Sequence, residues 1–130
     1  MSSFRMLIAP FAVIFVVSSV GCSSPTPGDT VEDFQRSIEA GEVERASQMI
    51  AGEILTIMPP AKLNGALAKE SQKLNKKGGI ASIEILSEDI QGNTASVRAR
   101  RTFGDGSSDE ATLELTRIDG AWKLTPAMTN

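Results

Sequence analysis

Histidine and tyrosine are missing from this 130-residue chain, and it has a single cysteine. Without histidine, neither a Ser-His-Asp nor a Cys-His catalytic group can form, and a histidine-ligated zinc site is excluded as well. The sequence also lacks the glycine-rich motifs that bind phosphates or dinucleotides. We therefore expect no metal and no cofactor, and an enzyme of this composition would have to work with carboxylates alone.

Basic residues are fewer than acidic ones. The chain has 13 Lys and Arg against 16 Asp and Glu, and its formal net charge is −3. Nucleic-acid-binding domains need a basic footprint, so we predict no nucleic-acid partner. The length is enough for one ordinary domain with a modest core after an N-terminal targeting segment.

The single cysteine, Cys22, follows an apolar run at residues 7–17. Arg5 gives the segment a positive start, and the run is shorter than the roughly 20 residues of a membrane-spanning helix. Gly21 directly precedes the cysteine and leaves room for a peptidase. This arrangement resembles the signal of a bacterial lipoprotein.

The resemblance implies that residues 1–21 are a signal peptide and that Cys22 is acylated, with a diacylglyceryl thioether and fatty acids such as palmitate. Residues 22–28 would then form a tether of at most about 20 Å, at roughly 3.3–3.6 Å per residue. Ser23 follows the cysteine, where Asp would favour the inner membrane, so we expect an outer-membrane anchor facing the periplasm. The alternatives are an ordinary cleaved signal or an uncleaved anchor with an incidental cysteine.

The first half of the remaining chain has helical periodicity. Thr26 and Asp29 are spaced as in a capping box around a first-turn proline, and Gly41 suits the end of that helix. A short helix is predicted around residues 43–50, and another between Pro59-Pro60 and Gly78-Gly79. The apolar residues on these helical faces are Val31, Phe34, Ile38, Ala46, Leu63, Leu67 and Leu74.

The second half predicts an antiparallel meander of four strands, at residues 80–90, 94–103, 108–118 and 121–125. Turn residues separate the strands, and the Asp-Gly pair at 119–120 is a strong hairpin signal. The expected fold class is therefore α+β, with N-terminal helices packed against a curved four-stranded sheet.

Two of the turns fix the register independently. A three-residue loop at 104–106 places Val97 opposite Leu113, and the 119–120 turn places Leu115 opposite Leu124. Both registers put these apolar residues on one face of the sheet. In the first hairpin the apolar residues favour opposite faces, which predicts a β-bulge.

This order of elements resembles the nuclear-transport-factor-2-like, or cystatin-like, superfamily. Within it, the chain is similar to family 4878 of the domains of unknown function, which are small bacterial lipoproteins. The matching segments are 27–34, 40–46, 78–80, 93–97 and 119–124. The resemblance implies that residues 29–130 form a cone in which the sheet curls around the first helix, and it assigns no activity.

Four residues are candidates for a pocket in this cone. Trp122 is the sole tryptophan, and it either packs in the core with Phe34 or forms a wall on which a ligand stacks. Arg101 shares its face with Phe103, and a buried arginine needs a partner. It therefore either pairs with Asp109 or binds an anion at the mouth of the cone.

A basic stripe is predicted on the third helix. Lys62, Lys69, Lys73 and Lys76 fall within about 60° of one another at about 100° per residue. Such a stripe is either a solvated face or a surface that rests on anionic lipid headgroups.

The function that we expect is that of a membrane-anchored lipoprotein facing the periplasm. Its domain would be a non-enzymatic binding module for a small ligand or an envelope protein. The alternatives are a carboxylate-dependent enzyme of the ketosteroid-isomerase-like type and a structural component of the envelope. A carboxylate facing an open cavity would favour the enzyme.

Overall fold

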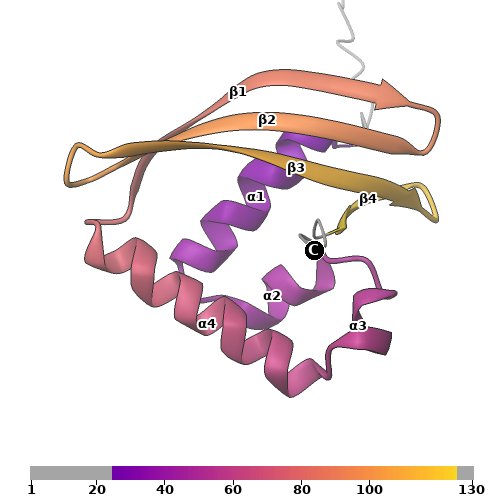
Figure 1. Ribbon diagram of the computed structural model, residues 1–130, viewed down its shortest axis with the longest axis horizontal. Coiled ribbons are helices and arrows are strands. Elements are labelled where there is room, and N and C mark those ends of the chain that lie inside the picture. Colours follow the sequence, from indigo (N-terminus) through magenta and orange to yellow (C-terminus); the bar gives the residue numbers. More distant parts are fainter. Residues whose placement is uncertain (1–24, 126–130) are drawn as a thin grey trace, which may run out of the picture.

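A computed structural model describes residues 25–125, and Figure 1 shows their arrangement. Cys22 and the predicted signal 1–21 lie outside these described residues. Four helices come first, namely α1 (Pro27–Glu39), α2 (Val43–Gln48), α3 (Ile54–Ile57) and α4 (Pro60–Lys76). Four strands follow, namely β1 (Ile80–Gln91), β2 (Thr94–Phe103), β3 (Ser108–Ile118) and β4 (Ala121–Thr125). None of the helices within residues 25–125 combines the length and apolar character needed to cross a bilayer.

Helix α1 begins with the predicted capping box. The Thr26 hydroxyl accepts a hydrogen bond from the Asp29 backbone N at 3.1 Å, and the Asp29 carboxylate accepts one from the Thr26 backbone N at 3.0 Å. Helix α1 includes Pro27 and Gly28, which are the last two residues of the segment 22–28 that we expected to form a tether. The expected tether is therefore shorter by these two residues. The backbone N of Gly28 donates to Glu88 Oε1 at 2.6 Å. This bond ties the start of α1 to β1.

The four strands form one antiparallel sheet in the order β1-β2-β3-β4, and the sheet is curved and open. Helix α1 lies against its concave face, and α2 and α4 pack on α1 from the other side (Figure 1). The core between these layers includes Val31, Phe34, Ile38, Leu67, Leu74, Val97, Phe103, Leu115, Trp122 and Leu124. The predicted α+β fold is therefore confirmed.

The predicted strand register is confirmed. Val97 lies opposite Leu113 between β2 and β3, and Leu115 lies opposite Leu124 between β3 and β4. The ladder between β1 and β2 shifts register twice, which is the irregularity that the conflicting apolar pattern of the first hairpin predicted.

The chain between α2 and α4 pairs with β4, which the sequence did not predict. Ile50 forms a parallel bridge with Leu124. The Leu124 backbone N donates to the Met49 carbonyl at 2.8 Å, and the Ala51 backbone N donates to the Leu124 carbonyl at 2.8 Å. Helix α3 follows directly, so this pairing fixes α3 beside the end of the sheet.

Candidate functional site

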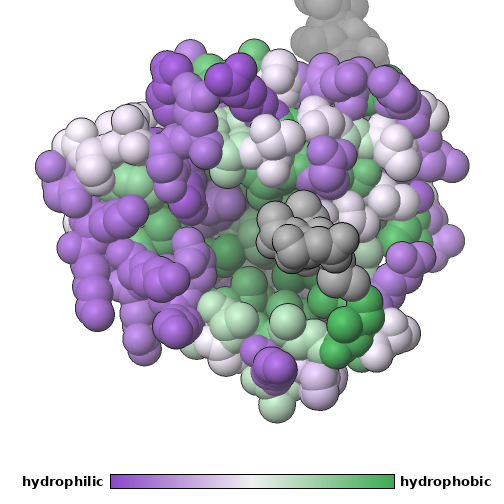
Figure 2. All heavy atoms as spheres, viewed as in Figure 1, coloured by the Kyte–Doolittle hydropathy of each residue, from purple (hydrophilic) through white to green (hydrophobic). Residues whose placement is uncertain are grey.

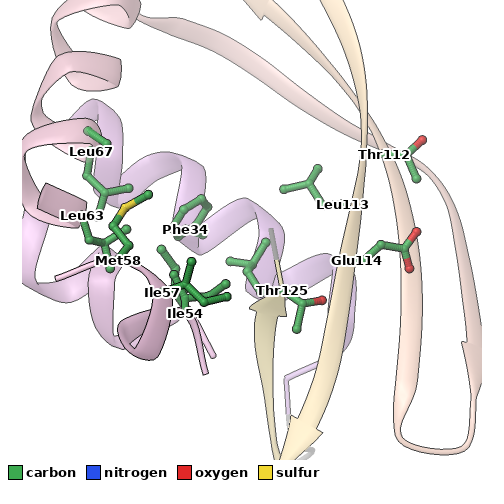
Figure 3. A pocket seen from close by; sticks show the side chains of 13 residues that line it. Phe34, Ile54, Ile57, Met58, Leu63, Leu67, Thr112, Leu113, Glu114 and Thr125 are labelled. Atoms are coloured by element: carbon green, nitrogen blue, oxygen red, sulfur yellow. The ribbon is translucent and has the colours of Figure 1, made fainter. Parts of the chain in front are cut away.

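An apolar groove opens between the helices and the β3–β4 end of the sheet (Figure 3). Its volume is about 510 Å³, and pockets that hold small ligands measure roughly 300–1,000 Å³. Figure 2 shows hydrophobic surface gathered on this side of the molecule, where Figure 1 places α3 and the start of α4. The residues that line the groove are Phe34, Ile50, Ile54, Ile57, Met58, Leu63, Ala66, Leu67, Thr112, Leu113, Glu114, Leu124 and Thr125.

The side chains of β3 alternate between the groove and the outer face of the sheet. Leu113 points into the groove, whereas Thr112 and Glu114 point away from it (Figure 3). The Glu114 carboxylate accepts a hydrogen bond from Ser96 Oγ at 3.0 Å. Glu114 is the one ionisable residue among those that line the groove. Because its side chain points away, the inner wall of the groove carries no charged side chain.

The mouth of the groove is also apolar. Ile57 lines it and is 62% exposed. On the sheet side, Ala111 is exposed and Leu113 is half-buried. Exposed apolar side chains that continue into a groove typically mark a binding surface.

At the other end of the concave face, Arg101 is held by three hydrogen bonds. It donates to both carboxylate oxygens of Asp109, at 2.9 and 2.7 Å, and to Gln35 Oε1 at 2.9 Å. Its guanidinium lies 5.2 Å from the centre of the Phe103 ring. The hydrogen bonds from Arg101 lower the pKa of Asp109. The predicted Arg101–Asp109 pair is therefore confirmed, and each guanidinium nitrogen already donates to a protein acceptor.

The structure does not bring the four predicted pocket residues together. Phe34 lines the groove, whereas Arg101 and Phe103 lie at the opposite end of the concave face. Trp122 borders a separate hollow of about 440 Å³, where the Arg117 guanidinium lies 4.5 Å from the ring centre. The small side chains of Ala95 and Ala99, which share a face of β2 with Arg101, are 2% and 3% exposed and are therefore covered.

The predicted lysine stripe lies on the solvent side of α4. Lys62, Lys69, Lys73 and Lys76 are all exposed, and α4 lies across the molecule from the start of α1 (Figure 1). A membrane contact of these lysines stays a prediction. Residues 25–125 contain no cluster of three side chains suited to hold a metal ion.

The part of the groove wall that α3 and Met58 form was not predicted from the sequence. Ile54, Ile57 and Met58 lie between two predicted helices, where no helical face accounted for them. That unexplained run of apolar residues was the signal that could have located the site.

Comparisons with solved structures agree with this architecture. The crystal structure of a candidate NTF2-like transpeptidase from Campylobacter jejuni is similar with a TM-score of 0.65 and 20% identity, over 76% of this chain and 96% of that chain. The solution structure of a SEC-C motif-containing protein from Rhodopseudomonas palustris is similar with a TM-score of 0.57 and 11% identity, over 80% and 78% of the two chains. At these identities the likeness shows the fold alone. Among curated proteins, none matches the chain.

The family model described as "Domain of unknown function (DUF4878)" matches residues 20–125. The match covers most of the chain and includes both the helices and the sheet. The family resemblance that the sequence motifs indicated is thereby confirmed. This chain belongs to the DUF4878 family and has an NTF2-like fold.

Proposed function

We propose that this protein is a non-enzymatic binding module of the bacterial cell envelope and that the groove is its binding site. The observation that carries the proposal is the apolar inner wall, which continues to the exposed side chain of Ile57 at the mouth. When a partner covers apolar surface of this kind, removing the surface from water lowers the free energy of the complex.

Binding is better supported than catalysis. A carboxylate enzyme needs an acid or a base within reach of its substrate. Glu114 points away from the groove, and the buried polar residues of the described chain are Thr30, Gln35, Ser37 and Ser71. No observation within residues 25–125 favours the ketosteroid-isomerase-like alternative.

The envelope location is supported by the sequence, since the apolar run at 7–17 and the Gly21-Cys22 pair resemble a lipoprotein signal. Its test is the intact mass of the protein purified from membranes, beside a Cys22→Ser variant. We expect a mass that starts at Cys22 and includes acyl groups, and we expect the variant to lose both features. An unacylated mass with another start contradicts the anchor and leaves the groove proposal standing.

A bulky side chain inside the groove should block binding. Ala66 lines the groove from α4, whereas Ala61 is an exposed alanine of the same helix outside it. With anilinonaphthalene sulfonate as the apolar probe, Ala66→Phe should weaken binding by about tenfold, which corresponds to about 1.4 kcal/mol. The matched variant Ala61→Phe should bind like the unmodified protein. Equal binding by both variants would show that the groove is not the site, and the structural-component alternative would gain support.

A further inference from the structure

Strands β3 and β4 keep one register up to the end of the described chain. The ladder runs from the turn between them to the pair of Glu114 and Thr125 without a register shift. Residues 126–130 lie outside the described part of the chain. If the same register continues, they fall opposite residues 113–109 of β3, in that order. Leu113 in this stretch points into the groove (Figure 3), so the sequence that follows β4 bears directly on the groove.

Alternate residues of β3 direct their backbone groups toward the side on which β4 lies. Successive residues of a strand direct their N–H and C=O groups to opposite sides. The Arg117 backbone N donates to the Asn93 carbonyl at 2.7 Å, so the odd-numbered residues of β3 face β2. The even-numbered residues face β4, and Glu110 and Thr112 direct their N–H and C=O groups to that same side.

The backbone of β4 alternates in the complementary way. The Leu124 backbone N donates to the Met49 carbonyl, and the Ala51 backbone N donates to the Leu124 carbonyl, both at 2.8 Å. The even-numbered residues of β4 therefore face away from β3, and the odd-numbered ones bond with it. Proline has no N–H group and is accommodated in an edge strand where that group would face away from the ladder. Pro126 has such an even number, so it would remove no hydrogen bond from the pairing with β3.

The side chains of β4 also alternate, between the concave face and the outer face of the sheet. Trp122 and Leu124 are buried on the concave face, whereas the residues between and beside them are exposed or half-buried. The next two positions of the concave row are Pro126 and Met128, which are both apolar. The register above sets Met128 opposite Ala111, so apolar side chains would meet across the two strands.

We propose that residues 126–130 extend β4 along β3 and place Pro126 and Met128 over the groove, so that a ligand binds only after it displaces this segment. The proposal rests on the proposed function and adds the regulation of that same site. An apolar ligand and the Met128 side chain compete for one apolar wall. The apparent affinity for the ligand is then the intrinsic affinity reduced by the fraction of molecules in which the segment is displaced.

The segment is held by its backbone as well as by its side chains. Ala127 and Thr129 have odd numbers, so their N–H and C=O groups face β3 and bond with those of Thr112 and Glu110. Five residues of antiparallel strand span about 17 Å, at roughly 3.4 Å per residue. This length matches residues 109–113, along which the segment lies.

Hydrogen exchange at the backbone N–H groups of Glu110 and Thr112 tests the pairing. The full chain is compared with a variant that ends at Thr125 and keeps every described residue. We expect slow exchange in the full chain and exchange at least about tenfold faster in the shortened variant. Fast exchange in both chains would overturn the proposal. Equally slow exchange in both would show that another group covers these amides, and protection that disappears on dilution would make a second copy the occupant; either result also overturns it.

Anilinonaphthalene sulfonate tests the control of the groove. The shortened variant should bind the dye at least about tenfold more tightly than the full chain, because no segment has to be displaced. Within the full chain, Met128→Asn should also strengthen binding, because a polar amide packs poorly on an apolar wall. The matched variant Ala127→Asn changes a side chain of the outer face and should bind like the unmodified chain. Both changes are uncharged, so neither attracts nor repels the anionic dye.

The variant Ala66→Phe separates this proposal from the proposed function. If the full and shortened chains bind the dye equally and Ala66→Phe weakens both, the groove remains a binding site and its control by residues 126–130 is wrong. If Ala66→Phe changes binding in neither chain, the proposed function fails and the regulation fails with it. Hydrogen exchange then still shows whether the segment pairs with β3, so the two failures are distinguishable.

Discussion

The concave face of the sheet has one end that is closed by polar contacts and another that is open and apolar. At the closed end, Arg101 bonds with Asp109 and Gln35, and each partner is a protein group. At the open end, Leu113 and Ile57 border a groove that the described residues leave unfilled. One sheet thus supports both ends. Contacts at the closed end hold the helices against the sheet, and the open end is where we propose that a partner binds.

The closed end also includes the loop that connects α4 to β1. The Gly104 backbone N donates to the Gly79 carbonyl at 3.0 Å, and the Asp105 backbone N donates to the Lys77 carbonyl at 2.9 Å. The loop after α4 therefore lies directly against the β2–β3 hairpin. This backbone contact fixes one end of α4, which in turn holds the wall of the groove.

The largest contrast is expected from leucine truncations at the two ends of α4. Leu74 is 2% exposed and does not line the groove, so Leu74→Ala should lower the free energy of unfolding by about 3–4 kcal/mol. Leu63 lines the groove, where solvent can enter, so Leu63→Ala should cost about half as much. Urea unfolding measures both. Equal costs would mean that the two ends are packed alike.

The glycine contact at the closed end should give the next largest effect. A Cβ atom on Gly104 would overlap the backbone carbonyl of Gly78, which has no rotamer to move away. Gly104→Ala should therefore lower the free energy of unfolding by about 2–3 kcal/mol. A Cβ atom on Gly65, in α4, would meet open space, so Gly65→Ala should raise stability by up to about 1 kcal/mol. Urea unfolding again measures both changes, and the same sign for the two would contradict the close contact.

The smallest expected effect is at the Arg101–Asp109 pair, and it depends on pH. Arg101→Met should lower the free energy of unfolding by about 1–2 kcal/mol at pH 7, because Asp109 and Gln35 lose a donor. Hydrogen bonds from Arg101 lower the pKa of Asp109 below its ordinary value of 3.8, so the folded protein binds this proton less readily than the unfolded chain. The stabilisation is therefore present above pH 3.8 and is lost as the pH falls through the folded-state pKa.

Unfolding curves between pH 7 and pH 2 check this prediction. The difference between the unmodified protein and Arg101→Met should shrink as the pH falls. Glu110 and Asp105, whose pKa values are also lowered, titrate in both proteins and cancel in the comparison. A difference that stays constant with pH would show that Arg101 acts through packing alone.

The sequence predicted the closed end better than the open end, and the reason is physical. The pair of Arg101 with Asp109 follows from turn length and strand alternation, which are local rules. The groove depends on α3, whose four residues are too few to show a helical period. Ile50 and Leu124 meet through a bridge between segments far apart in the chain, and no local pattern contains that contact.

The single tryptophan gives this protein an optical property that follows from its sequence and fold. Because the chain has one tryptophan and no tyrosine, its near-ultraviolet emission comes almost entirely from Trp122. The indole is 7% exposed beneath Arg117, and it lies two residues before Leu124 on the strand that borders the groove. The colour and lifetime of that emission therefore report on one place in the sheet, and no added label is needed to observe it.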